Sequence, residues 1–276
     1  MWIGSPLRGA FRLLIYFLLT VLLLPVHLLA LALNIVPVYR WLPVYYHRMV
    51  CFILGIRVRV HGRQSQITPT LFVCNHVSYL DIEVLGGMVP GSFVAKAEVA
   101  GWPFFGWLAK AQRTIFVERV SGRASRSRDE MLKRLDTGDN LMLFPEGTSS
   151  DGTRVLPFRS ALFGVAQLRR NDRPIVVQPV AIAYTRLDGI PLGRYWRPLF
   201  AWFGDLDLVP HLWQMVCLGE TQAVVTFFPP VDIDQLGDRK KLAEYCFQQV
   251  SFGVQSANAG RPELLPPLAG AAPVAS

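Results

Sequence analysis

An uncharged, strongly apolar run from Leu13 to Tyr39 constrains this 276-residue chain more than any other feature. Its first part, Leu13–Leu33, is 21 residues long, and a helix of about 20 apolar residues is long enough to cross a bilayer. A cleaved signal peptide fits less well, because its apolar core is usually about 7–15 residues and ends at a small-residue site. We therefore expect the N-terminal part of the chain to be helical and embedded in a membrane.

The arginines that flank this run bear on how the segment sits in the membrane. Two precede the run and two follow it: Arg8 and Arg12, then Arg40 and Arg48. Basic residues usually gather on one side of a span, so a pair at both ends favours a helical hairpin that enters and leaves the same leaflet. Pro25 would bend the run, and Trp41–Ile56 would form the second leg. Residues 1–56 are predicted to be a membrane anchor, either as this hairpin or as a single span.

The distribution of charge indicates an anionic membrane surface rather than a nucleic acid. The chain carries 28 Lys and Arg against 20 Asp and Glu, a net charge of +8. Residues 1–66 hold seven of the arginines and no acidic residue, so the remainder is nearly neutral, with 21 basic and 20 acidic residues. A nucleic-acid-binding domain would interleave basic and aromatic residues over its soluble part. We expect a protein of the cell (inner) membrane whose remaining part, from residue 57, faces the cytoplasm, with no nucleic-acid partner.

The four cysteines give no sign of a metal site or of a disulfide framework. Cys51, Cys74, Cys217 and Cys246 form neither a CxxC pair nor a zinc-ligand pattern with the histidines. We expect buried free thiols in a reducing, cytoplasmic setting, and no metal is predicted.

From residue 57 the sequence alternates between short β-type runs and helical stretches. Strands are predicted at 57–61, 70–74, 92–96, 113–118, 140–144, 175–183 and 223–229, and helices at 126–135, 161–170 and 240–251. This alternation predicts an α/β fold over 57–255, with a mixed sheet flanked by helices. The tail 256–276 is expected to be disordered. The aromatic-rich segment Pro191–Leu218 is either a buried helical excursion or a second membrane-contacting surface.

A histidine and an aspartate follow the predicted strand 70–74, in the sequence NHVSYLD (Asn75–Asp81). On one regular helix, side chains five residues apart point about 140° apart, so the two meet only if His76 lies in the loop and Asp81 in the first helical turn. Asp81 then fixes the imidazole tautomer and leaves the other ring nitrogen as a base. Alone, this spacing often arises by chance, and Asn75 and Ser78 suit structural roles as turn and N-cap residues.

Two further blocks also stand at strand ends. In FPEGT (Phe144–Thr148), Pro145 ends the strand and Gly147 permits an unusual turn, which presents Glu146 there. FVER (Phe116–Arg119) ends on an arginine, a residue suited to bidentate contacts with phosphate or carboxylate. Taken singly, the first block is equally a structural turn and the second a surface ion pair.

Together and in this order, the blocks resemble the glycerolipid acyltransferase family, the lysophospholipid acyltransferases that include the 1-acylglycerol-3-phosphate acyltransferases. The family pattern is NHxSxxD, FxxR, FPEGT and a VPVAI-like block, the last matched here by VQPVAI (Val177–Ile182). The resemblance covers residues 45–235 and extends to the N-terminal apolar region typical of bacterial members. It implies acyl transfer to a lysolipid hydroxyl from a thioester of coenzyme A or acyl carrier protein, without another cofactor.

The resemblance also implies roles for single residues. His76 would deprotonate the acceptor hydroxyl, and Asp81 would orient His76 and stabilise its charge. Pro145 and Pro179, the latter within the VQPVAI block, are expected to be structural. The substrate-binding residues that the family pattern suggests are Arg119, Glu146, Gly147, Thr148, Arg159 and Lys96.

One departure from the pattern bears on the acceptor. The family motif usually continues FPEGTR, whereas Ser149 follows here, and the next basic residues are Arg154 and Arg159. The runs FGDLD (Phe203–Asp207) and PHLW (Pro210–Trp213) resemble a subset that includes lyso-ornithine lipid acyltransferases. The expected reaction is acylation of 1-acyl-sn-glycerol-3-phosphate to phosphatidic acid, with lyso-ornithine lipid as the alternative acceptor. A non-catalytic lipid-binding protein of the same fold is the alternative from another class.

Overall fold

The computed structural model describes residues 3–117, 124–170 and 172–263. Its main sheet is built from β1 (Ile56–Gly62), β2 (Thr70–Cys74), β3 (Gly91–Lys96), β4 (Ile115–Val117), β5 (Asn140–Leu143), β8 (Val176–Leu187), β9 (Ile190–Pro191) and β10 (Thr221–Phe227). The strand order is β1-β10-β8-β2-β5-β3-β4, with β9 paired to β8. Along this order every pair is parallel except β10 with β8, so the predicted mixed sheet is confirmed.

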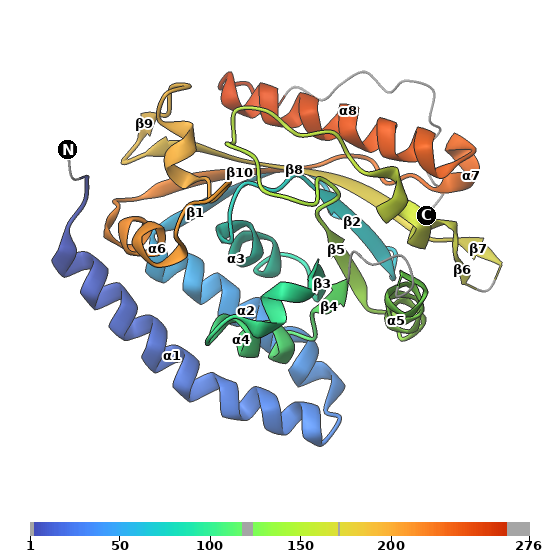
Figure 1. Cartoon of the computed structure of the whole chain (residues 1–276), viewed down its shortest axis with the longest axis horizontal. Coiled ribbons are helices and arrows are strands. Elements are labelled where there is room, and N and C mark those ends of the chain that lie inside the picture. The colour runs from blue at the N-terminus through green and yellow to red at the C-terminus, as the bar shows by residue number, and fades with distance from the viewer. Residues whose placement is uncertain (1–2, 118–123, 171, 264–276) are drawn as a thin grey trace.

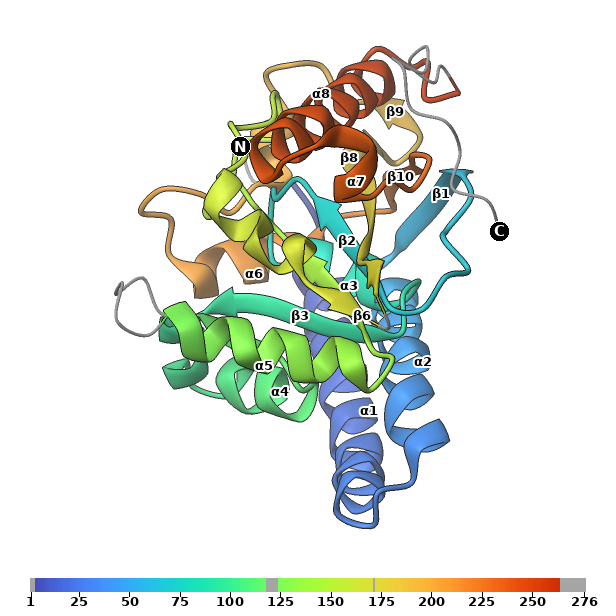
Figure 2. The same cartoon turned by 90° about the vertical axis from the view of Figure 1, so that its right-hand side faces the viewer.

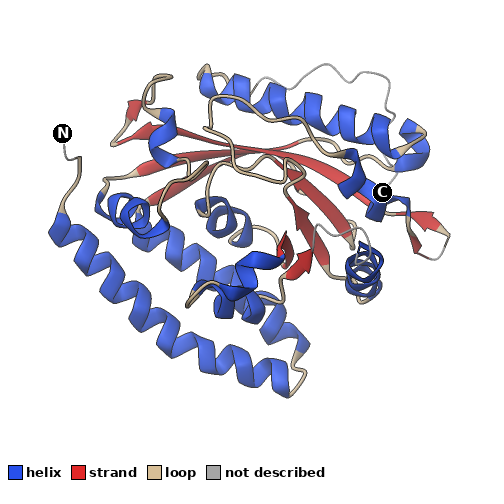
Figure 3. Ribbon diagram, in the orientation of Figure 1, coloured by secondary structure: helices blue, strands red, loops and turns tan. Residues whose placement is uncertain are grey.

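Helices cover both faces of this sheet, as Figures 1 and 3 show. The α-helices are α1 (Pro6–Ala32), α2 (Val36–Leu54), α3 (Leu80–Gly86), α4 (Phe105–Ala111), α5 (Ala124–Asp136), α6 (Leu208–Cys217), α7 (Ile233–Leu236) and α8 (Arg239–Asn258). Shorter elements are the 3₁₀ helices η1 (Ala97–Gly101), η3 (Ser160–Gln167) and η4 (Arg197–Phe200), and the two-stranded ribbon of β6 (Arg169–Arg170) and β7 (Arg173–Pro174). In Figure 1, α8 lies on one face, α2, α3 and α6 lie on the other, and α1 lies outside them.

The central strand β2 shows why the sheet is buried on both faces. All five of its residues are buried, which fits its unbroken apolar sequence. Leu71 and Val73 point into the core beneath α5, α7 and α8, whereas Phe72 and Cys74 point into the core shared with α2, α3 and α6. The motif NHVSYLD (Asn75–Asp81) follows the carboxyl end of this strand, and the loop that contains it therefore starts from a rigid position.

The N-terminal region is a helical hairpin, with α1 and α2 packed side by side (Figure 2). The chain reverses at Leu33–Ile35, where Asn34 takes a positive φ of 52°, and not at Pro25, which lies within a continuous α1. Asparagine is among the few residues that tolerate this conformation, and a proline in the first turn of α2 helps that helix to start. The second leg therefore begins at Val36, earlier than the predicted Trp41.

Helix α1 is packed against the rest of the protein near both of its ends. Close to its start, the Arg12 guanidinium donates to the carbonyls of Val216 and Leu218 at 3.1 and 2.7 Å. Near its end, His27 Nε2 lies 2.9 Å from the carbonyl oxygen of Ala111 in α4. Its opposite face is an exposed apolar stripe, formed by Leu7, Phe11, Leu14, Leu18, Val21, Leu22 and Leu29. Among the described residues, α1 alone is long and apolar enough to cross a membrane.

Two further segments differ from the predictions, and the cysteines agree with them. The predicted helix 161–170 is the 3₁₀ helix η3 followed by β6; the threefold winding of η3 places Phe163 and Ala166 on one buried face. Helix α8 continues to Asn258 and buries Ser256, so the start of the predicted tail is helical, while residues 264–276 lie outside the described residues. All four cysteines are free and buried, as predicted.

Candidate active site

His76 and Asp81 form a hydrogen-bonded pair at the carboxyl end of β2. His76 lies in the loop and Asp81 in the first turn of α3, the arrangement that their spacing required. His76 Nδ1 lies 2.8 Å from Asp81 Oδ2, which leaves Nε2 as the nitrogen that can take up a proton. The imidazole stacks on Phe144, with ring centroids 4.3 Å apart, and its side chain is 21% exposed. The pair therefore combines a solvent-accessible base with a buried carboxylate.

Asp81 is held by four donors. Besides His76, its Oδ2 accepts the backbone N–H groups of Val77 and Ser78 at 2.6 and 2.9 Å. Its Oδ1 accepts the hydroxyl of Tyr184 from β8 at 2.9 Å. Asp81 is 0% exposed, and a buried carboxylate is stable in its charged form only when such donors surround it. The charge of Asp81 is thus directed at the imidazole.

Glu146 takes a different place from the one expected at the acceptor head group. It is 2% exposed, and its two oxygens accept the backbone N–H groups of His76 and Leu156 at 2.6 and 2.8 Å. Burial raises the pKa of Glu146 to about 8, against the effect of these two hydrogen bonds. With both oxygens occupied, Glu146 joins the FPEGT loop to the loop that carries the base.

The residues around Gly147 lie on the surface beside this junction. Gly147 has a φ of 68° and donates its N–H to the carbonyl of Phe144, so that amide is used within the turn. A Cβ at Gly147 would lie 3.1 Å from the Arg159 guanidinium carbon, which shows how closely the arginine covers the turn. Thr148 and Arg159 are exposed, and the carbonyl of Pro145 accepts the N–H of Arg159. The side chains of Thr148 and Arg159 are therefore open to solvent beside the FPEGT turn.

The remaining predicted residues have mixed outcomes. Asn75 bonds both backbone groups of Ile182, which ties the motif to β8, and Pro179 lies in β8 opposite Val73. The Ser78 hydroxyl is buried and caps no helix; within the described part of the chain it has no hydrogen-bond partner. Lys96 ends β3 at the same sheet edge and is half-buried. Arg119 lies outside the described residues.

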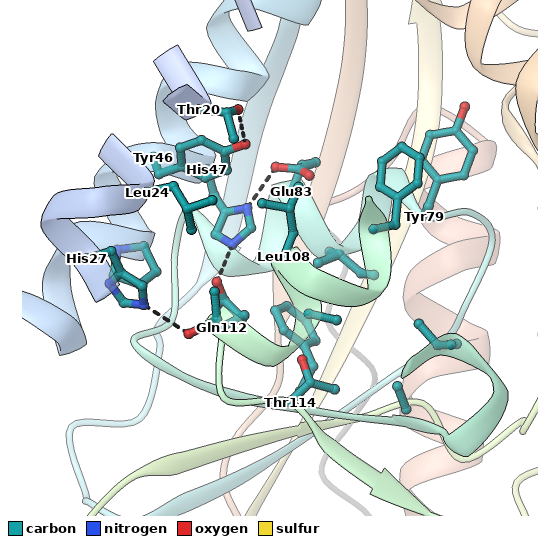
Figure 4. Close-up of a pocket in the computed structure, with 18 of the residues that line it drawn as sticks. Thr20, Leu24, His27, Tyr46, His47, Tyr79, Glu83, Leu108, Gln112 and Thr114 are labelled. Carbon is teal, nitrogen blue, oxygen red and sulfur yellow. Dashed lines mark hydrogen bonds and ion pairs between the residues drawn. The ribbon is translucent and has the colours of Figure 1, made fainter. Parts of the chain in front are cut away.

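An apolar cavity of about 170 Å³ lies between the hairpin and the domain (Figure 4). Its apolar walls include Leu23, Leu24, Phe93, Trp102, Phe105 and Leu108. His47 of α2 forms a polar side wall, since its ring nitrogens face Glu83 Oε2 at 2.7 Å and Gln112 Oε1 at 2.9 Å. Phe93 stacks on Phe144, which in turn stacks on His76, so an unbroken row of rings leads from the cavity to the base.

Comparison with known proteins identifies the family of this chain. The family model "Acyltransferase" matches residues 57–183. The lyso-ornithine lipid O-acyltransferase of Rhizobium meliloti is 41% identical, over 90% of this chain and 85% of that protein. The chain belongs to the acyltransferase family.

A second curated relative and a solved structure are also similar to this acyltransferase. The 1-acyl-sn-glycerol-3-phosphate acyltransferase of Neisseria gonorrhoeae is 34% identical, over 69% of this chain and 71% of that protein. The crystal structure of the 1-acyl-sn-glycerophosphate acyltransferase of Thermotoga maritima has a TM-score of 0.64 at 20% identity and covers 92% of this chain and 97% of that one. At that identity the likeness shows a shared fold.

Tyr184, which donates to Asp81 in the site of this acyltransferase, was not predicted from the sequence motifs. It follows the VQPVAI block on the same strand and stacks on Phe200 with centroids 5.5 Å apart. Burial, and then the charge of Asp81, raises the pKa of its hydroxyl well above the usual value, so it remains a donor. A polar aromatic side chain inside a buried apolar strand was the available signal, because such a hydroxyl needs a partner.

Replacing Tyr184 by phenylalanine is expected to lower kcat by about 10-fold. The ring and its stacking remain, but Asp81 loses one of its four donors, and a hydrogen bond to a charged group contributes about 1.5–3 kcal/mol. Initial rates of Tyr184→Phe and of the unmodified enzyme, over a range of acceptor concentrations, separate the change in kcat from the change in KM. An unchanged kcat would rule out this positioning role.

Proposed function

We propose that this acyltransferase transfers a fatty acyl group from a coenzyme A or acyl carrier protein thioester to the hydroxyl of lyso-ornithine lipid. The observation that carries the choice of acceptor is the extent of the similarity to lyso-ornithine lipid O-acyltransferases, which spans nine-tenths of the chain at 41% identity. The similarity to 1-acyl-sn-glycerol-3-phosphate acyltransferases is shorter and lower. Ser149, in place of the arginine that usually follows FPEGT, agrees with an acceptor other than a phosphate.

The site supports a direct transfer without an acyl-enzyme. His76 Nε2 accepts the proton of the acceptor hydroxyl while its oxygen attacks the thioester carbonyl carbon. Asp81 holds Nδ1 and stabilises the imidazolium that forms. As the tetrahedral intermediate collapses, the carbon–sulfur bond breaks and His76 returns the proton to the leaving thiolate, so the base is regenerated. The exposed side chains of Arg159 and Thr148 would orient the polar head group of the acceptor.

The apolar cavity suits the hydrocarbon chain of a substrate. Its walls come from the anchor helices α1 and α2 as well as from the domain, and it lies next to Tyr79 in the loop between His76 and Asp81. A chain inserted there would exchange water for contact with aliphatic and aromatic side chains, which favours binding. If this hydrocarbon chain belongs to the acyl donor, its thioester carbonyl carbon would then lie close to His76.

The anchor is proposed to lie in a single leaflet. If α1 spanned the bilayer, its contacts near residues 12 and 27 would draw α6 and α4 into the hydrocarbon on opposite sides. A hairpin that lies along the membrane surface keeps all these contacts and exposes the apolar stripe of α1 to lipid. We propose that the domain then lies at the cytoplasmic face of the cell membrane, because that is where coenzyme A and acyl carrier protein thioesters are found.

We expect purified enzyme to acylate lyso-ornithine lipid with a kcat/KM at least about 10-fold above that for 1-acyl-sn-glycerol-3-phosphate. That ratio corresponds to about 1.4 kcal/mol of difference in transition-state binding. A head-to-head assay with both acceptors, the same acyl donor and matched detergent measures it. The reverse preference would support the lysophosphatidic acid function, and equal rates would contradict selection by the head group.

A further inference from the structure

A band of exposed apolar side chains lies outside the hairpin. Trp107 of α4 is 73% exposed, and Phe203 and Leu206 in the loop before α6 are 36% and 46% exposed. Val209, in the first turn of α6, is 75% exposed. Single exposed apolar residues are ordinary on soluble proteins, but these four come from two segments that pack together.

Aromatic contacts join the two segments to each other and to α1. Trp102, just before α4, meets Trp202 edge-on at 5.3 Å, and Trp202 Nε1 donates to the carbonyl of Leu206 at 2.7 Å. Phe104 packs on Phe17 of α1 with centroids 5.5 Å apart. The segments that carry the band are therefore packed against each other and against α1.

The same loop is bonded to the catalytic motif. The backbone N–H of Trp202 donates to the carbonyl of Val77 at 3.0 Å, and the Trp202 ring contacts that of Tyr79 at 6.2 Å. Both partners lie between His76 and Asp81 in the chain. The loop that carries Phe203 and Leu206 is therefore connected directly to the loop of the His76–Asp81 pair.

We propose that this band, Trp107 with Phe203, Leu206 and Val209, is a second membrane-contacting surface that enters the lipid headgroup region beside α1. This inference rests on the proposed membrane-bound function and extends it to residues outside the hairpin. The loop carries Asp205 and Asp207 and no basic residue, so its contact depends on apolar insertion rather than on attraction to anionic lipid. The segment Pro191–Leu218 then serves both expected roles, because α6 buries its second half, including Met215 and Cys217.

The test places an environment-sensitive fluorophore on single introduced cysteines in the full chain. Leu206→Cys probes the band, Leu18→Cys probes α1, and Ile190→Cys is the control; Ile190 is 70% exposed and lies on β9, away from α4 and α6 in Figures 1 and 2. The four native cysteines are buried. The vesicles contain phosphatidylethanolamine and phosphatidylglycerol with brominated acyl chains, which quench a fluorophore in contact with them.

We expect vesicles to quench the labels at 206 and 18 but not the label at 190. Quenching at 18 alone would overturn the proposed band and leave the membrane-bound function intact. If no label is quenched, the membrane-bound function fails, and the band fails with it. High salt is expected to leave the quenching at 206 unchanged in protein that stays bound.

A functional readout uses the double variant Trp107→Gln with Leu206→Gln. We expect its rate with acceptor presented in vesicles to fall about 10-fold, since two exposed apolar side chains no longer insert. Its rate with the same acceptor dispersed in detergent should equal that of the unmodified enzyme. Equal rates on vesicles would overturn the proposal, and an equal loss in both assays would assign the residues to folding instead.

Discussion

Replacement of His76 by alanine is expected to reduce acyl transfer by at least about 100-fold to 10,000-fold, because the only base of the pair is removed. The side chain is partly exposed and stacks on one ring, so its loss should leave the fold intact. Initial rates of membranes or purified enzyme carrying His76→Ala, with both acceptors, measure the effect.

His61 offers a matched control for this variant. It is half-buried in β1, which lies at the sheet edge with β10 and β8 between it and β2. His61→Ala is expected to keep nearly full activity, whereas undiminished transfer by His76→Ala would reject the assigned base. If the unmodified protein bound lipid but acylated no lysolipid, the proposed activity would be rejected in favour of a non-catalytic lipid-binding protein of the same fold.

Replacement of Glu146 by alanine is expected to have the second largest effect. The N–H groups of His76 and Leu156 would both lose their acceptor inside the protein, and each such loss costs about 1–3 kcal/mol. We expect a free energy of unfolding lower by about 2–5 kcal/mol and kcat lower by about 100-fold, because the loop that carries the base is released. Chemical denaturation in detergent and initial rates measure the two effects.

Glu146 also predicts a pH dependence whose sign can be stated. Its pKa is raised from the ordinary value of 4.5 to about 8, so the folded state binds its proton more tightly than the unfolded state. The stability that it contributes is fully present below about pH 4.5 and is lost as the pH rises through about 8. Glu146→Gln should remove this slope, whereas Glu130→Gln, at an exposed position, should keep it. An identical slope in both variants would show that Glu146 does not titrate in this range.

The local part of the site was predictable from the sequence, and the distant part was not. His76 and Asp81 lie five residues apart and directly follow a buried strand, so one short stretch determines their geometry. Tyr184 comes from a strand 103 residues further along, and only the pairing of β8 with β2 brings it to Asp81. Glu146 was singled out from its motif, but its buried side chain accepts hydrogen bonds from backbone N–H groups. A sequence motif does not reveal such backbone contacts.

In the fold, too, local features were predictable from the sequence and features that depend on packing were not. Strand β2 agrees with its prediction to the residue, since an apolar run between turn residues defines both of its ends. The reversal of the hairpin did not, because Pro25 is tolerated inside a helix whose other hydrogen bonds persist, whereas Asn34 makes the turn. The 3₁₀ winding of η3, which packs against α8 and α5, was not predicted, because a short run of apolar residues does not distinguish it from an α-helix.

The contacts at the start of α1 can form only late in the synthesis of the chain. This first helix leaves the ribosome early, yet Arg12 bonds a carbonyl 204 residues further along, and Gly9 packs against Cys217 so closely that a Cβ there would lie 2.5 Å from its Sγ. Until those residues have been synthesised, this end of α1 has only α2 to pack against. The hairpin and the sheet domain can therefore complete their contacts only after most of the chain has been made, which argues against a hairpin that folds as a separate unit.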